Sequence, residues 1–129
     1  MTKQERCELY RDILSEQGHD AAIDDQGDVV FEYEGGTYFV QVSDDEMYFR
    51  LIYPNFWPLE SDEERKRVRR AALTATAETK VAKVFPVDDN VWATIEMFCS
   101  PPEVVAPSIP RALSALRDAV TTFQERMEA

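Results

Sequence analysis

The stretch from residue 29 to residue 53 constrains the fold more than any other part of this sequence. Apolar and polar residues alternate along it, and a period of two is typical of a β-strand with one buried face. Glu34-Gly35-Gly36-Thr37 interrupts the alternation, and glycine tolerates the positive φ angles that a two-residue hairpin loop needs. We therefore predict a hairpin with Gly35-Gly36 as its loop and Tyr33 opposite Tyr38.

A second tight turn at Asp44-Asp45 would add a third strand and place Val40 opposite Phe49. A shift of one residue would exchange the two faces of the sheet, so the alternation strongly determines which residues face the core. With both turns in place, one face of this antiparallel meander collects only apolar or aromatic side chains: Val29, Phe31, Tyr33, Tyr38, Val40, Val42, Met47, Phe49, Leu51 and Tyr53.

Helices are expected on both sides of the meander. The first is predicted from Thr2 to Gln17, ahead of a short strand at 21–24, because apolar residues recur there at helical spacing. The second is predicted from Ser61 to Thr79, and Ser61-Asp62-Glu63-Glu64 has the pattern of a capping box at its start. The apolar stripe of the first helix is Cys7, Tyr10, Ile13 and Leu14, and the thinner stripe of the second is Val68, Ala71, Ala72 and Ala75.

A two-stranded hairpin and a last helix complete the chain. Strands at 80–87 and 91–99 flank a turn at Asp88-Asp89-Asn90, with Val87 opposite Asn90. Ser100-Pro101-Pro102-Glu103 resembles a second capping box, and the final helix is predicted from Ser108 to Met127. The order helix, three-stranded meander, helix, hairpin, helix predicts a single layered α+β domain over residues 1–129.

Charge and composition exclude several classes of function. The chain has 14 Lys and Arg residues against 25 Asp and Glu residues, a net charge of -11, which disfavours binding to nucleic acid or to an anionic membrane surface. We expect no membrane span, because no apolar run approaches the roughly 20 residues that one needs. The absence of a secretory signal and two widely separated cysteines, Cys7 and Cys99, favour a cytoplasmic location.

No motif in the sequence specifies a reaction. His19 is the only histidine, lies beside Asp20 after the first helix, and is expected to be a solvated loop residue. One histidine and two distant cysteines cannot supply a four-ligand zinc site. The acidic residues near Asp24 lack the spacing of an EF-hand loop, so cation binding is the weaker interpretation. We expect no enzyme activity, no metal and no cofactor.

Five of the basic residues lie within Arg65-Lys66-Arg67-Val68-Arg69-Arg70. Three interpretations remain open: a solvated helix that pairs with its own acidic neighbours, a surface that docks an acidic protein or a second copy of this chain, and a nucleic-acid contact. For docking, the candidate residues are Arg65, Arg67 and Arg70, with Ala71 and Ala75 allowing a second backbone to approach closely.

The second face of the sheet carries large apolar side chains among charged ones, although such faces are normally polar. Apolar patches of this kind are typical of interaction surfaces. The alternative is that the loop at 55–58 or the second helix covers this face. The candidate partner-binding residues are Phe39, Tyr48, Ile52, Phe85, Trp92 and Phe98.

The chain resembles the type III secretion chaperone-like fold, in particular its YbjN-like branch, the putative sensory transduction regulators. The residues that carry this resemblance are those at 29–42, those at 47–51 and the terminal helix at 109–127. The resemblance implies a non-enzymatic cytoplasmic protein, often a homodimer, that binds a segment of another protein. YbjN-like proteins are linked to stress and signalling regulation, and no family residues carry over to specific positions here.

Three functions are therefore compared. The first is a protein-binding module, either a chaperone or a signalling and stress adaptor, that receives a partner segment in a groove or at a strand edge. The second is a small-ligand-binding domain or an enzyme with a pocket between the sheet and the C-terminal helix. This alternative predicts polar residues on the core face, which offers none beyond tyrosine hydroxyls. The third is an oligomeric structural protein.

Overall fold

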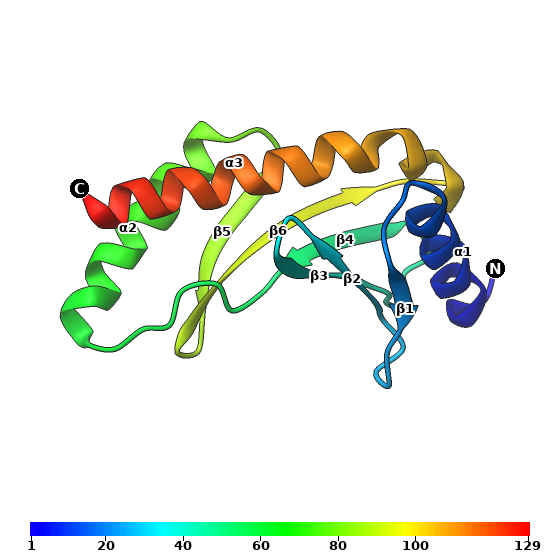
Figure 1. Cartoon of the computed structure of the whole chain (residues 1–129), viewed down its shortest axis with the longest axis horizontal. Helices are drawn as coiled ribbons and strands as arrows, with labels where there is room; N and C mark the ends of the chain where they lie inside the picture. Colours follow the sequence, from blue (N-terminus) through cyan, green and yellow to red (C-terminus); the bar gives the residue numbers. More distant parts are fainter. The chain divides into compact units, whose positions relative to one another are not determined.

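The computed structural model describes all 129 residues, and the chain divides into two compact units. Unit 1 comprises Met1–Ile52 and Glu96–Ile109, and unit 2 comprises Tyr53–Ile95 and Pro110–Ala129. The architecture is α+β, as predicted (Figure 1). Six strands form a sheet in the order β1-β2-β3-β4-β6-β5. The elements are α1 (Lys3–Glu16), β1 (Ala21–Ile23), β2 (Val29–Tyr33), β3 (Gly36–Gln41), β4 (Tyr48–Tyr53), α2 (Asp62–Glu78), β5 (Ala82–Val87), β6 (Asn90–Phe98), the 3-10 helix η1 (Pro102–Ser108) and α3 (Ile109–Glu128).

Helix α1 begins at a capping box in unit 1. The Glu5 amide donates to Thr2 Oγ1 at 3.0 Å, and the Thr2 amide donates to the Glu5 carboxylate at 2.9 Å. The predicted stripe of α1 is buried, and the helix contacts β1, β2 and η1. The Tyr10 ring meets the Phe49 ring edge-on at 5.4 Å, which joins the helix to the core face of the meander.

The β2–β3 hairpin has the predicted faces but a different register. Tyr33 lies opposite Gly36, and Phe31 lies opposite Tyr38, so each pairing is two residues away from the predicted one. The loop is Glu34-Gly35, whose φ angles are 46° and 82°, and not Gly35-Gly36. Because side chains alternate, an offset of two keeps every residue on its predicted face.

The connection from β3 to β4 is longer than a tight turn, and the predicted pairing is again offset by two, with Val40 opposite Leu51. The Val42 amide donates to the Asp28 carboxylate at 2.9 Å instead of pairing with Met47. Met47 is 52% exposed, so its assignment to the core face is wrong. The other nine residues predicted for that face are buried or half-buried.

Ser61 caps the N-terminus of helix α2 in unit 2, as predicted, and its hydroxyl accepts from the Glu64 amide at 3.1 Å. The second half of the predicted capping box differs, because the Glu64 carboxylate accepts from the Glu60 amide at 2.9 Å. The four residues of its thin stripe are buried, and α2 contacts β5. The Thr76 hydroxyl accepts from the Val84 amide at 2.9 Å and donates to the Val84 carbonyl oxygen at 3.3 Å.

The β5–β6 hairpin confirms the predicted pairing of Val87 with Asn90. The second predicted capping box is wrong: Pro101 occupies the N-cap position of η1, and no side chain caps it. Helix α3 follows directly, and its stripe is buried throughout: Ile109, Leu113, Leu116, Val120, Phe123 and Met127. None of the three α-helices combines the length and the apolar character that crossing a bilayer requires.

Candidate functional site

Two neighbouring aromatic side chains form an exposed patch on unit 1, and we call Tyr48 and Phe98 the unit 1 patch. Phe98 is 75% exposed, and its ring lies 6.3 Å from the half-buried ring of Tyr48. The Cys99 amide donates to the Met47 carbonyl oxygen at 2.7 Å, which holds the two segments side by side. Both residues of the unit 1 patch were predicted partner-binding residues.

The polar side of this patch is the Glu96 carboxylate. The Tyr48 hydroxyl donates a hydrogen bond to it. Partial burial, and next the bond to Glu96, raises the pKa of the Tyr48 hydroxyl to about 12. Tyr48 therefore stays neutral at physiological pH, and it presents a ring face whose hydroxyl already has a partner.

Two other predicted residues of unit 1 contribute less to a surface. Phe39 lies opposite Ile52 in the β3–β4 ladder and is half-buried. Ile52 is only 3% exposed, so its assignment to a partner-binding surface is wrong. The large β-branched side chain is enclosed within the folded chain and cannot meet a partner there.

The remaining two predicted residues belong to unit 2. Phe85 and Trp92 are direct cross-strand neighbours of the β5–β6 hairpin, and both are half-buried. The Trp92 indole donates to the Asn55 side-chain oxygen at 2.9 Å. Phe56 and Trp57, the apolar residues of the same loop, instead meet the Phe123 ring of α3 at 5.5 and 5.6 Å. This loop therefore reaches Trp92 through Asn55.

The net charge of the chain is distributed very unevenly between the units. Unit 1 has 4 basic and 15 acidic residues, so it carries the whole net charge of -11. Unit 2 has 10 residues of each sign and is neutral. Because opposite charges attract over about one Debye length, roughly 8 Å in physiological salt, what a partner meets depends on the local surface.

The five predicted docking residues of α2 have different environments. Ala71 and Ala75 are buried within the chain, so the prediction that they meet a second copy is wrong. Their small side chains let α2 lie close to β5 instead. Arg65 donates to the Asp88 carbonyl oxygen and to the Asp89 carboxylate, both at 3.1 Å, and so holds the β5–β6 turn.

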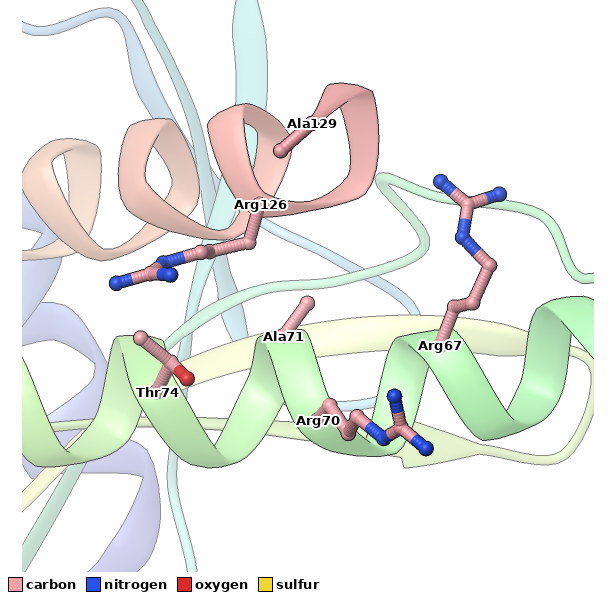
Figure 2. A pocket seen from close by; sticks show the side chains of 6 residues that line it. All are labelled: Arg67, Arg70, Ala71, Thr74, Arg126 and Ala129. Carbon is pink, nitrogen blue, oxygen red and sulfur yellow. The ribbon is translucent and has the colours of Figure 1, made fainter.

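Arg67 and Arg70, in contrast, line a groove of unit 2 (Figure 2). The groove has a volume of about 330 Å³, and Arg126 reaches into it from the last turns of α3. Arg67 donates to the Met127 carbonyl oxygen, whereas Arg70 is exposed. Arg126 was not selected from the sequence, because nothing in its local pattern indicates that α3 passes beside α2.

The remaining side chains that could support chemistry are the metal-ligating residue types, the two thiols and the one histidine. No three His, Cys, Asp or Glu side chains are grouped so that they could hold a metal ion. Burial is the main cause that raises the pKa of Cys7 and of Cys99, so neither thiol is activated as a thiolate. His19 is half-buried and so less solvated than expected: its ring lies 5.4 Å from the Phe31 ring in a tilted arrangement, and it meets the Tyr33 ring edge-on at 5.9 Å.

Solved structures of similar proteins place this geometry in a known fold. A chain of the HopA1–SchA chaperone–effector complex has a TM-score of 0.61 at 15% identity, over 95% of this chain and 92% of that one. YbjN from E. coli, a putative transcription regulator, has a TM-score of 0.62 at 12% identity, over 91% and 88%. The chain has the type III secretion chaperone-like, YbjN-like fold.

An uncharacterised protein from Methanothermobacter thermautotrophicus has the same chaperone-like fold, with a TM-score of 0.59 at 15% identity, over 95% of this chain and 99% of that one. No protein-family model and no curated protein matches the sequence. At identities of 12–15%, the likeness is one of fold. The resemblance predicted from residues 29–42, 47–51 and 109–127 is therefore confirmed at that level.

Proposed function

We propose that this chain is a non-enzymatic protein-binding module, a chaperone-like or regulatory adaptor that holds a segment of a partner protein. The observation that carries the proposal is the unit 1 patch, in which Phe98 is 75% exposed beside Tyr48. When a partner covers an exposed aromatic ring, apolar surface is removed from water, and this stabilises the complex. The fold supports the proposal, because one protein that shares it belongs to a chaperone–effector complex.

The test compares Phe98→Ser with Leu73→Ser. Leu73 is 71% exposed on α2 in unit 2, so it is a matched apolar control outside the unit 1 patch. Tagged wild-type and variant proteins are used to capture partners from the source cell, and the captured proteins are identified by mass spectrometry. We expect one partner to be retained by Leu73→Ser and lost by Phe98→Ser, since a hot-spot aromatic contributes about 2 kcal/mol or more.

Melting temperatures separate binding from stability in this experiment. Both side chains are mostly in water, so each substitution is expected to change the free energy of unfolding by about 0.5 kcal/mol or less. A partner that both variants retain would contradict the assignment of the unit 1 patch. A partner that both variants lose equally would show that the capture reports general surface hydrophobicity.

We further propose that the protein acts in the cytoplasm as a homodimer. Both cysteines are free thiols, in keeping with a reducing compartment. Large apolar side chains remain exposed on both units, among them Phe98, Leu73 and Val81, and such residues favour association. Light scattering at micromolar concentration is expected to give twice the 14.8 kDa of one chain. A mass of one chain at all salt concentrations would contradict the dimer.

A further inference from the structure

The groove of unit 2 between α2 and the last turns of α3 has an unusual set of charges. Arg67 and Arg70 of α2 and Arg126 of α3 line it together with the Thr74 hydroxyl (Figure 2). Every charged side chain of its lining is an arginine, and Ala71 and the last residue, Ala129, complete the lining. Its volume of about 330 Å³ lies at the lower end of the range for ligand sites in proteins, which is roughly 300–1,000 Å³.

The positive charge of this groove is only weakly compensated by the protein itself. Arg126 meets the Glu78 carboxylate at 3.4 Å, and both side chains are more than half exposed, so the pair is weak. Arg67 uses one N–H group on the Met127 carbonyl oxygen, which carries no net charge. Arg70 is exposed and makes no ion pair within 4.0 Å, so several guanidinium donors remain available to a ligand.

The groove extends along α2 toward its N-terminus. An adjoining hollow of about 470 Å³ shares Arg67 and Arg70 and adds Lys66 and Ser61. It also contains Glu63 and Glu64, and the Glu64 carboxylate is turned toward the Glu60 amide at 2.9 Å. From Ser61 to Thr74 the helix rises about 20 Å, at 1.5 Å per residue. An extended peptide of about six residues covers that distance.

We propose that this groove binds the carboxylate side chains of an acidic segment in a partner protein. The inference rests on the proposed function in one respect, namely that the chain binds a segment of another protein. Guanidinium groups form two parallel hydrogen bonds to a carboxylate, so three arginines from two helices suit successive Asp or Glu side chains. The Thr74 hydroxyl offers one more donor in the lining of the groove.

The short length of the groove and the net negative charge of the protein favour a short acidic segment over a nucleic acid as the ligand. A nucleic acid extends past the groove and meets the field of a chain with net charge -11. A six-residue segment remains within about one Debye length, roughly 8 Å, of the arginines, where their attraction dominates.

Fluorescence anisotropy with the purified full chain and a labelled hexaglutamate peptide tests this proposal. Hexaglutamine of the same length is the control peptide. Arg70→Glu is expected to weaken binding of hexaglutamate about tenfold or more, since it reverses a charge in the groove. Arg69→Glu makes the same change in net charge on the same exposed helix but outside the groove lining, and it is expected to change the affinity less than about twofold.

Four results would overturn the proposal. Equal effects of Arg69→Glu and Arg70→Glu would show a diffuse field and no site. Equal affinity for hexaglutamine, or for single-stranded DNA, would remove the acidic peptide as the ligand class. Displacement of hexaglutamate by inorganic phosphate, added at the same total concentration of negative charge, would indicate a site for small anions. A wild-type dimer that Arg70→Glu dissociates would assign the groove to a second copy of the chain.

The two proposals can fail separately. Phe98 lies in unit 1 and not in the lining of this groove, so Phe98→Ser is expected to retain hexaglutamate binding. Loss of partner capture by Phe98→Ser with intact peptide binding supports both sites. Intact capture by Arg70→Glu, with peptide binding absent even in the wild type, overturns the groove alone.

Discussion

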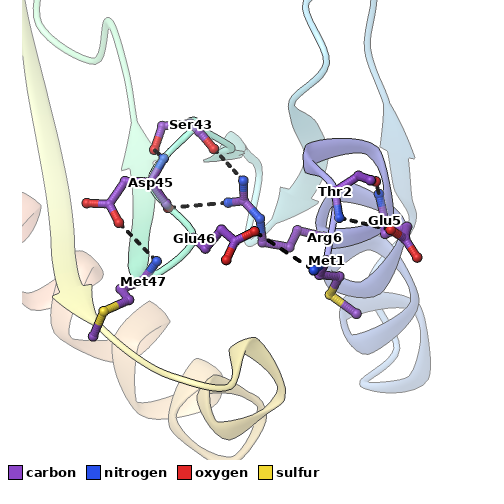
Figure 3. Close-up of polar contacts among 8 residues, drawn as sticks. All are labelled: Met1, Thr2, Glu5, Arg6, Ser43, Asp45, Glu46 and Met47. Carbon is purple, nitrogen blue, oxygen red and sulfur yellow. Dashed lines mark hydrogen bonds and ion pairs between the residues drawn. The ribbon is translucent and has the colours of Figure 1, made fainter.

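The guanidinium group of Arg6 donates a hydrogen bond of 2.7 Å to the backbone carbonyl oxygen of Ser43 (Figure 3). A second bond of 3.4 Å reaches the Asp45 carbonyl oxygen, so one side chain of α1 holds the connection between β3 and β4. Arg6 is only 2% exposed, which is rare for an arginine. The N-terminal amine also lies 3.8 Å from the Glu46 carboxylate, at the edge of the same loop.

Replacing Arg6 with methionine is expected to lower the free energy of unfolding by about 2–4 kcal/mol. The substitution keeps an unbranched side chain in the core, but it leaves the carbonyl oxygens of Ser43 and Asp45 without their donor. Urea denaturation followed by circular dichroism measures this change. Arg11→Met is the matched control: Arg11 is a partly exposed arginine of α1 that pairs with Asp12, and its loss is expected to cost about 0.5 kcal/mol or less.

Gly35→Ala is expected to destabilise the β2–β3 hairpin by about 1–2 kcal/mol, because Gly35 has a φ of 82°. No atom lies within 4 Å of the Cβ that would be added, so the cost is conformational and not steric with neighbours. Gly35→Asn is expected to cost less, since asparagine adopts the left-handed region more readily. Thermal unfolding of the two variants gives the comparison, and equal stability of both would contradict this account.

Thr76→Val is expected to lower the free energy of unfolding by about 1–3 kcal/mol. The Thr76 hydroxyl satisfies both the amide and the carbonyl group of Val84, and valine has the same shape without the hydroxyl. β5 is the last strand of the sheet, so this contact also blocks a free strand edge. We therefore also expect faster aggregation of Thr76→Val on heating, measured by turbidity. Thr74→Val, on the same helix, is the control.

Stability at high pH is expected to depend on Tyr10. Burial, as the main cause, raises the pKa of the Tyr10 hydroxyl to about 12, against about 10 in the unfolded chain. The folded state therefore keeps a proton that the unfolded state loses. The stabilisation is present below pH 10 and is lost as the pH rises toward 12.

Tyr10→Phe cannot ionise, so its free energy of unfolding is expected to fall less than that of the wild type between pH 10 and pH 12. Urea denaturation at a series of pH values measures the two slopes. Identical slopes would show that Tyr10 does not contribute to alkaline unfolding. The tyrosinate absorbance of the native protein gives an independent check, because Tyr10 is expected to ionise only near or after unfolding.

The unit 1 patch and the groove of unit 2 differ in how far the sequence predicted them. Alternation along β6, with the right pairing of Val87 and Asn90, placed Phe98 on its face of the sheet, but its exposure does not follow from alternation, because Thr94 on the same face is fully buried. Burial of Ile52 could not be predicted, because alternation places it on the same face as Phe39 but says nothing of what covers that position. The arginine groove was half predicted: Arg67 and Arg70 were selected, and Arg126 was not.

The sequence by itself determined the element order, the ends of the helices and the face on which each strand residue lies. These properties are local, because caps, helical spacing and alternation act over a few residues. Only the tertiary structure decided the strand register, the role of Arg6 and the burial of Ala71 and Ala75. An offset of two residues leaves every face unchanged, so the alternating pattern cannot distinguish the registers. Contacts between residues far apart in the sequence, such as Arg6 with Ser43 and Asp28 with Val42, hold the backbone in the register that forms.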